Sequence, residues 1–261
     1  MPNQASALPV TDFQSVILVI LARDEVHSLR ETVESLSALL PAGDVEQLVM
    51  FLAPDSTPEC NAMALELEKT VSSFPVRTWL QQTQMPVAEL QRLLAQKSKA
   101  SHALMLSADL EISPEMALQM LQACKKNPVA LVSLSRWREG GGFTRYTKWQ
   151  LPLHRFFQSV VRALYGARLS TDATAGYCAV AKQIFEGLCL REKRQSVFLE
   201  YKLTLLRLGL PLIEIPVQFR VRREGKSTGG FWHKLRYLVP LLRVRFLPPE
   251  KLFRFGDGCN V

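Results

Sequence analysis

Short apolar runs alternate with stretches of helical spacing through the first half of the chain. The run 15–22 (SVILVILA) is apolar and rich in β-branched residues, which is typical of a strand covered on both faces. In the next stretch, 27–40, leucine and valine recur every three or four residues, as on one face of a helix. The same patterns predict strands over 47–54, 76–80, 102–108 and 129–137, and helices over 58–71, 87–99 and 114–126. This alternation favours an α/β fold with a mostly parallel sheet flanked by helices.

The second half of the chain is less regular. We expect a flexible loop at 140–143 (GGGF), helices over 151–165 and 198–209, a strand over 212–221 and a basic, glycine-rich loop at 222–230. Gly209 is expected to close the second of these helices. No linker or repeat interrupts the elements. We therefore expect one domain over 15–230, with a tail, 1–14, before it and a basic amphipathic segment, 231–261, after it.

Composition narrows the class of protein. The chain of 261 residues carries a net charge of +8, mostly in its second half, which implies an anionic partner. Its five cysteines are scattered without a C-x-x-C pair, so we expect reduced thiols rather than a disulfide framework or zinc site. The sequence shows no signal peptide and no apolar run of the ~20 residues that span a bilayer. A cytoplasmic protein is the expectation.

Polar residues stand where four of the predicted strands end. In an open parallel sheet, ligands bind at the carboxyl ends of the strands. The four ends carry Arg23-Asp24-Glu25, Ala53-Pro54-Asp55-Ser56, Ser107-Ala108-Asp109 and Ser135-Arg136-Trp137. We therefore expect acids, hydroxyls and an arginine to line one crevice.

The third of these ends has the chemistry of a metal site. Asp109 and Glu111 directly follow an apolar strand, whereas Ser107 stands where a second acid would complete an Asp-x-Asp pair. Mg²⁺ takes only one or two protein carboxylates when phosphate oxygens and water supply its other ligands, so the loss at position 107 is tolerable. The alternative is that both acids open a surface turn before Pro114.

A series of ordered motifs carries a family resemblance. The motifs are VILVILARDE, LAPDST, LMLSADLEISPE, SLSRWREGG, R-x-x-x-S at 155–159, TDATAGY, FLEYKLTLLRLGLPLIEIPVQF and RREGKS, within about 15–245. In this order the chain resembles the inverting family-two glycosyltransferases of GT-A fold. It is most similar to dolichyl- and polyprenyl-phosphate mannosyl- or glucosyltransferases. The resemblance implies a Rossmann-like GT-A domain that transfers a hexose from a UDP- or GDP-sugar to a polyprenyl or dolichyl phosphate.

For the donor, the resemblance implies a divalent metal ion, Mg²⁺ or Mn²⁺. Asp109 and Glu111 would bind it, and Asp109 would thereby take part in catalysis. The nucleotide site would use the ends of the first two strands, where Asp24 and Glu25, after the first strand, contact the nucleoside. Ala22 and Ala108 are also implied to bind substrate.

Two further motifs are implied to bind the sugar donor. Asp55 and Ser56 correspond to an Asp-Asp-Gly-Ser motif from which the acid is displaced by about one residue. Capping of the helix entered at Pro58 is an equal alternative for them. Arg222 and Ser227 match R-x-x-G-x-S, which resembles a loop that closes over the donor diphosphate. Its glycine lets backbone N–H groups approach phosphate.

For the acceptor, the resemblance implies that Arg136, Arg155 and Ser159 hold a phosphate. A guanidinium fork suits phosphate, and residues four apart share a helical face. Solvated surface arginines are the alternative. Asp172 of TDATAGY is implied to shape the floor of the sugar site, and Glu200 matches an acid on the following helix.

Several alternatives stay open. The basic, aromatic segment after 231 fits either peripheral contact with the inner face of an anionic membrane or a terminal helix that covers the sheet. Transfer to a sugar hydroxyl, in polysaccharide or lipopolysaccharide synthesis, is the rival activity. A catalytically silent nucleotide-sugar-binding relative is suggested by Ser107 and the displaced Asp55. No nucleic-acid partner is expected, because the cations sit at small-molecule motif positions without an RNP-type aromatic pattern.

Overall fold

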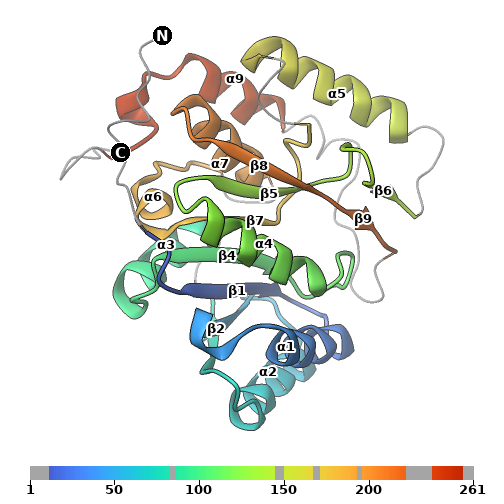
Figure 1. The fold of residues 1–261 in the computed structure, drawn as a ribbon, viewed down its shortest axis with the longest axis vertical. Helices are drawn as coiled ribbons and strands as arrows, with labels where there is room; N and C mark the ends of the chain where they lie inside the picture. Colours follow the sequence, from blue (N-terminus) through green and yellow to red (C-terminus); the bar gives the residue numbers. More distant parts are fainter. Residues whose placement is uncertain are drawn as a thin grey trace.

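A seven-stranded, mostly parallel sheet forms the centre of the protein (Figure 1). The computed structural model describes residues 12–82, 86–144, 150–166, 171–192, 196–221 and 237–254. The strands are β1 (Val16–Ala22), β2 (Val45–Leu52), β3 (Val76–Leu80), β4 (His102–Ser107), β5 (Leu131–Ser135), β7 (Cys178–Ala181) and β8 (Leu212–Pro216). They lie in the order β3-β2-β1-β4-β7-β5-β8, in which β7 runs antiparallel to β4 and β5. Two short strands, β6 (Gly142–Phe143) and β9 (Gln218–Phe219), form a separate parallel pair.

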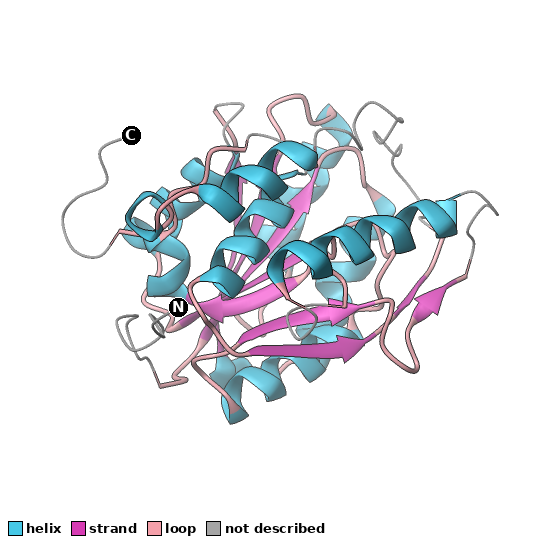
Figure 2. Cartoon of the chain, turned by 90° about the horizontal axis from the view of Figure 1, so that it is seen from above, coloured by secondary structure: helices cyan, strands magenta, loops and turns pink. Residues whose placement is uncertain are grey.

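Helices cover both faces of the large sheet (Figure 2). They are α1 (His27–Leu39), α2 (Pro58–Thr70), α3 (Pro86–Lys97), α4 (Glu115–Lys126), α5 (Gln150–Tyr165), α6 (Lys182–Gly187), α7 (Ser196–Arg207) and α9 (Leu238–Phe246). The alternation in β1 shows why both faces need cover. Leu18 and Ile20 pack in the cluster with α1, α2 and α4, whereas Ile17 and Val19 pack with α3, α6 and α7. A third apolar cluster joins α5, α7 and α9 beyond β8 (Figure 1).

The strand order creates a topological switch point between β1 and β4. From β1 the chain proceeds to β2 and then β3 on one side, and it returns to the other side of β1 as β4. Open α/β sheets bind ligands outside the carboxyl ends of the strands at such a point. The switch-point rule therefore places a ligand site at the loops after β1 and β4.

The elements predicted for the first half of the chain are all present, but the second half requires corrections. β7 and α6 were missed, because CAVA is a run of four small or β-branched residues without a clear period. The expectation of a flexible loop at 140–143 is wrong for Gly142 and Phe143, which pair with β9. The predicted strand 212–221 is divided, because Pro216 has no N–H to extend the ladder. Gly209 has the left-handed φ of 86° expected of a residue that closes a helix.

The cysteines are of two kinds. Cys60, Cys124 and Cys178 are buried free thiols, as expected. Cys189 is disulfide-bonded, so the expectation of reduced thiols is wrong for this residue. Scattered spacing could not reveal this pairing, because it depends on which chain segments meet in the fold. Within the described residues, no helix has the length and apolar character needed to cross a bilayer.

Candidate functional site

The loop after β4 presents two carboxylates at the switch point. Asp109 is 3% exposed, and its Oδ1 accepts a hydrogen bond of 3.2 Å from the backbone N–H of Glu111. Such a bond closes an Asx turn, which fixes an aspartate relative to the backbone two residues on. Between these acids, Leu110 has a φ of 53°, the only positive φ of a non-glycine residue in the described chain. A left-handed leucine costs about 1–2 kcal/mol, so packing must hold this turn in place.

Three different elements anchor this loop. The N–H of Ala108 donates to the carbonyl of Leu21 at the end of β1, over 3.2 Å. The hydroxyl of Tyr177 donates to the carbonyl of Ser107, over 3.1 Å. The N–H of Arg220, just beyond β9, donates to the carbonyl of Glu111, over 2.8 Å. The loop that carries Asp109 and Glu111, called the carboxylate loop below, is thus hydrogen-bonded to β1, to the turn before β7 and to the end of β9.

The ends of β1 and β2 are joined by an arginine. Arg23 Nε lies 3.3 Å from Asp55 Oδ1, and the Ser56 hydroxyl donates to the Arg23 carbonyl over 2.5 Å. Glu25 Oε2 accepts from the N–H groups of Arg23 and Asp24, over 2.7 and 3.1 Å. The structure therefore brings together the residues predicted to bind the sugar donor at these two strand ends, beside buried Ala22. They are Asp24, Glu25, Asp55 and Ser56.

The capping alternative for Asp55 and Ser56 is not what the structure shows. Thr57 is the N-cap of α2, and its side chain accepts from the N–H of Cys60 over 3.3 Å. Asp55 is exposed and contacts Arg23, so its charge remains at the edge of the candidate donor site.

Arg136, at the end of β5, is enclosed by its partners. Its Nε lies 2.6 Å from Asp172 Oδ2, and its Nη2 lies 2.7 Å from both Asp172 Oδ1 and Thr174 Oγ1. The guanidinium also stacks on two rings, with its carbon 5.2 Å from the centre of Phe143 and 4.6 Å from that of Phe219. Its side chain is only 9% exposed. The fork that was expected to hold an acceptor phosphate is thus occupied by the Asp172 carboxylate.

Asp172 is fully buried and remains ionised. Burial by itself raises the pKa of this carboxyl, but the charge and hydrogen bonds of Arg136 outweigh burial and lower the pKa to about 2. Lys202, also fully buried, donates from Nζ to the Asp172 carbonyl over 2.6 Å. Burial lowers the pKa of Lys202. The Asp172 carboxylate is therefore a buried structural anion that is paired with Arg136.

Glu214 completes the buried network from β8. Its carboxylate accepts from the N–H of Thr171 over 3.0 Å, from the Thr171 hydroxyl over 2.6 Å and from the N–H of Asp172 over 3.2 Å. Sequence reasoning missed Glu214 and Lys202. A signal was present, because Glu214 is the single charge in the apolar stretch LIEIP, and Lys202 is the single charge in YKLTLL. Buried charges of this kind are paired, and here they fix the turn before β7.

Helix α5 carries the second arginine of the expected acceptor site. Arg155 and Ser159 are exposed, and the Ser159 hydroxyl donates to the Arg155 carbonyl over 3.0 Å. Between them, buried Gln158 accepts from the N–H of Ala173 over 3.1 Å. Gln158 thus fixes α5 against the turn that holds Asp172, while Arg155 faces outward. Sequence reasoning overlooked Gln158.

Glu200 is buried, and its carboxylate is held by backbone N–H groups and an arginine. It is 2% exposed, and its Oε2 accepts from the N–H groups of Arg191 and Glu192, over 2.9 and 2.8 Å. Burial raises the pKa of its carboxyl. Arg243 of α9 lies 3.5 Å from its Oε1. The remaining predicted residues, Arg222 and Ser227, lie outside the described residues, as do the parts 231–236 and 255–261 of the basic segment.

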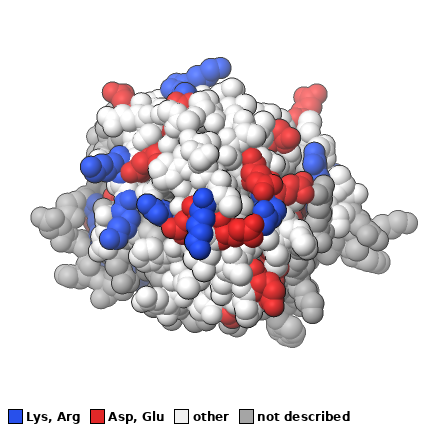
Figure 3. All heavy atoms as spheres, turned by 90° about the horizontal axis from the view of Figure 1, so that it is seen from below, with Lys and Arg blue, Asp and Glu red and all other residues white. Residues whose placement is uncertain are grey.

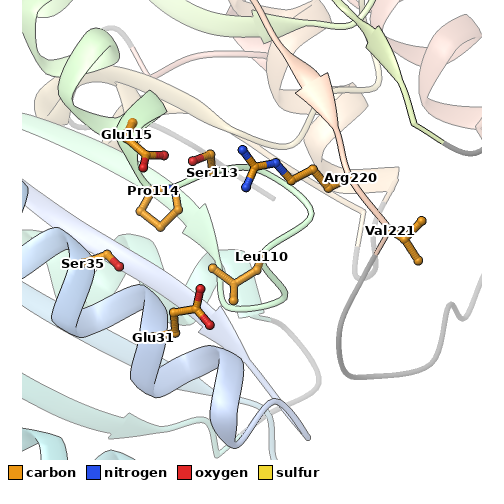
Figure 4. A pocket seen from close by; sticks show the side chains of 8 residues that line it. All are labelled: Glu31, Ser35, Leu110, Ser113, Pro114, Glu115, Arg220 and Val221. Atoms are coloured by element: carbon orange, nitrogen blue, oxygen red, sulfur yellow. The ribbon is translucent and has the colours of Figure 1, made fainter.

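A pocket of about 110 Å³ lies against the carboxylate loop (Figure 4). Its lining residues are Glu31, Ser35, Leu110, Ser113, Pro114, Glu115, Arg220 and Val221. In Figure 4, Glu31 points from α1 towards Leu110, and the guanidinium of Arg220 points towards Ser113. Ligand pockets usually have volumes of about 300–1,000 Å³, so this one is too small for a nucleotide sugar.

Surface charge gives no sign of a nucleic-acid interface on the face in Figure 3. Acidic and basic side chains are interleaved there rather than gathered by sign. Pairs such as Arg30 with Glu66, at 2.7 Å, show the same mixing on α1 and α2. A nucleic-acid footprint would be a continuous basic patch.

No protein-family model matches the sequence, and no curated protein matches it. Solved structures do resemble it. One is glucosyl-3-phosphoglycerate synthase from Mycobacterium tuberculosis in complex with Mn²⁺, UDP-glucose and phosphoglyceric acid, with a TM-score of 0.66 over 94% of this chain and 83% of that chain, at 17% identity. The same enzyme with Mg²⁺ and UDP gives a TM-score of 0.64 at 17% identity, over 94% and 83% of the two chains. A further mycobacterial protein gives 0.66 at 17% identity, over 94% and 78%.

The fold is GT-A. At 17% identity the likeness shows the fold alone. In this GT-A domain the carboxylate loop after β4 stands at the switch point, which is the position that the fold uses for ligands.

Proposed function

We propose that the protein is an inverting, metal-dependent glycosyltransferase that moves a hexose from a UDP- or GDP-sugar to a polyprenyl or dolichyl phosphate. One observation carries the proposal: the anchored loop that holds Asp109 and Glu111 lies at the switch point of a GT-A sheet. The resemblance of the ordered sequence motifs supports it. So do the structural neighbours, whose complexes contain Mn²⁺ or Mg²⁺ with UDP or UDP-glucose.

The residues of the loop fit a hard divalent cation. The described residues contain no group of three or more His, Cys, Asp or Glu side chains that could hold a metal on its own. Mg²⁺ and Mn²⁺ suit such a place, because one or two carboxylates suffice when a diphosphate and water complete the shell. Asp109 would hold the ion, with Glu111 beside it. The bound ion would offset the negative charge that develops on the leaving nucleoside diphosphate.

The protein itself binds and orients the donor in this proposal. Asp24 and Glu25 would face the nucleoside, and the Arg23–Asp55 pair would close the edge of the site. Ser56 supports Arg23 from β2. Arg222 and Ser227, outside the described residues, are proposed to cover the diphosphate, and the tie between Arg220 and Glu111 supports this by starting their loop beside the carboxylates.

On the acceptor side, the two arginines take different parts. Arg155 is exposed on α5, so we assign it the contact with the acceptor phosphate, with Ser159 beside it. Arg136 would act through Asp172, because that carboxylate occupies its fork. Asp172 would in turn shape the floor of the sugar site. A phosphate oxygen is anionic at neutral pH, so attack on the sugar carbon needs no general base.

Exposed apolar side chains on α5 and α9 support an acceptor that resides in a bilayer. Six of the ten large hydrophobic side chains exposed in the described chain lie on α5 and α9; they are Leu153, Phe156, Leu238, Val239, Leu242 and Phe246. These six residues define the α5–α9 surface. Neither helix contains an aspartate or glutamate, and together they contain four arginines, of which Arg243 is paired with Glu192 and Glu200. Apolar side chains among cations suit the interface of an anionic membrane.

Two hydrogen bonds join the two helices. The hydroxyl of Tyr165 donates to the Leu241 carbonyl over 2.7 Å, and Arg245 Nε donates to the Leu164 carbonyl over 2.9 Å. α9 lies within the basic segment 231–261, for which a membrane contact was expected. We therefore propose that the α5–α9 surface, rather than the segment alone, lies on the membrane.

A transfer assay tests the proposal. A thermal-shift screen of UDP- and GDP-sugars with Mn²⁺ identifies the donor, because a ligand that binds only the folded state raises Tm. Transfer from that donor to short polyprenyl phosphates is the expected result. Transfer only to a free oligosaccharide, or only to phosphoglyceric acid, would replace the proposed acceptor. Donor binding without any transfer would favour the silent relative.

A further inference from the structure

Tyr177 lies beside the carboxylate loop but belongs to a different part of the chain. The register of the antiparallel pair sets Met105 of β4 against Cys178 of β7, so Tyr177 comes next to the end of β4. Its ring is buried, and its hydroxyl donates to the Ser107 carbonyl over 3.1 Å. Ser107 is the last residue of β4 before the carboxylate loop begins.

The charges of the loop act on this hydroxyl. Burial raises the pKa of Tyr177, and the carboxylates of Asp109 and Glu111 raise it further. The phenol is therefore protonated at neutral pH and serves as a hydrogen-bond donor.

We propose that Tyr177 is a positioning residue. Its hydroxyl fixes the Ser107 carbonyl at the end of β4, and this in turn fixes the backbone from which the Asp109 carboxylate reaches a divalent cation. The assignment rests on the proposed function for the metal itself. It gives Tyr177 a task distinct from filling the core.

The local backbone explains why such an anchor matters. Leu110 is held at a φ of 53°, which a leucine abandons when its surroundings allow. On one side of Leu110 the loop is tied by Ala108 to β1 and by Tyr177 to Ser107, and on the other side by Arg220 to Glu111. Loss of the Tyr177 anchor leaves the Ala108 bond to β1 as the one remaining of these ties on the side that carries Asp109.

The support behind Tyr177 is rigid. It follows the turn that Glu214 and Arg136 fix through Asp172, and that Gln158 fixes through Ala173. Tyr177 therefore connects the proposed floor of the sugar site with the proposed metal ligands. Residues one step removed from a metal commonly change its affinity ten- to a hundredfold when they are replaced.

The test compares Tyr177→Phe with Tyr165→Phe. Both changes delete a tyrosine hydroxyl that donates to a backbone carbonyl, over 3.1 Å to Ser107 and over 2.7 Å to Leu241. Only the first bond lies at the carboxylate loop, since the second joins α5 to α9. Two readouts are measured. The first is Mn²⁺ affinity in the presence of UDP and of GDP, from the paramagnetic signal of free Mn²⁺. The second is hydrogen exchange of the amides 108–111.

We expect Tyr177→Phe to weaken Mn²⁺ binding about tenfold and to accelerate exchange of the Glu111 amide. Tyr165→Phe should change neither, even where it lowers Tm by as much. Equal Mn²⁺ affinity and equal loop exchange in the two variants would overturn the inference while leaving the metal site intact. A wild-type protein that binds no Mn²⁺ with either UDP or GDP would refute the proposed function as well.

Discussion

The buried pair of Arg136 and Asp172 predicts a stability that depends on pH. Replacement of Arg136 by methionine keeps much of the side-chain length but leaves the Asp172 carboxylate, which is 0% exposed, without its main partner. Breaking a buried ion pair from one side costs about 3–5 kcal/mol, because a desolvated charge loses its compensation. The pKa of about 2, against an ordinary 3.8, corresponds to roughly 2 kcal/mol at neutral pH, which is of the same order.

The sign of the pH dependence follows from the two pKa values. In the wild type the folded pKa is depressed, so the contribution is complete above 3.8 and is lost as the pH falls towards 2. In the variant burial dominates and raises the folded pKa, so the penalty is complete at pH 7 and is relieved as Asp172 takes up a proton. The difference in free energy of unfolding between the two proteins should therefore be largest at pH 7 and shrink towards pH 4.

Urea denaturation at several pH values between 4 and 7 measures this difference. Arg30→Met is the matched control, because Arg30 and Glu66 are also 2.7 Å apart but have side chains 36% and 51% exposed. That exposed pair should contribute less than about 1 kcal/mol. A loss for Arg136→Met no larger than for the control, or a loss that does not change with pH, would refute the account of the buried network.

Three further predictions concern packing, membrane contact and the acceptor. Gly141→Ala should destabilise the protein by about 1–3 kcal/mol in urea denaturation, because the added Cβ would lie 2.6 Å from the Ser135 carbonyl oxygen, whereas Gly43→Ala meets nothing within 4 Å and should be nearly neutral. Leu242→Glu should reduce sedimentation with anionic liposomes, whereas Leu65→Glu, equally exposed but on α2, should not; equal effects would count against the α5–α9 surface. Arg155→Ala should slow transfer to a polyprenyl phosphate by roughly ten- to a hundredfold and leave the affinity for the sugar donor unchanged. Arg155→Lys should restore part of the rate, because it restores the charge but not the guanidinium fork. Full transfer activity of Arg155→Ala would exclude the assigned contact.

Much of this fold could be predicted from local pattern alone. β1 and α1 bury their apolar residues at periods that the sequence displays, and Gly209 closes α7 as its type suggests. β7 could not be predicted in this way. It is four residues long and antiparallel, and it is stabilised by its neighbours β4 and β5 rather than by a period of its own.

The candidate site was predictable where residues act through their position at a strand end. Asp109, Glu25 and Asp55 all stand where the switch-point rule places them. The contacts of Arg136 were not predictable, because a guanidinium suits a phosphate and a carboxylate equally well. Only the fold shows that the guanidinium of Arg136 is paired with Asp172, 36 residues away. Tyr177 was hidden for the same reason, since its bond to Ser107 spans 70 residues.

Calorimetric binding of the donor identified by thermal shift, with and without Mn²⁺, tests the central claim most directly. Three proteins are compared: the wild type, Asp109→Asn and Ser107→Ala. Asparagine keeps the size of the buried Asp109 side chain but removes its charge, so the fold should persist while the cation loses its principal ligand. We predict that Mn²⁺ strengthens donor binding in the wild type and in Ser107→Ala, and that this enhancement disappears in Asp109→Asn. Undiminished enhancement by Mn²⁺ in a folded Asp109→Asn protein would contradict the account.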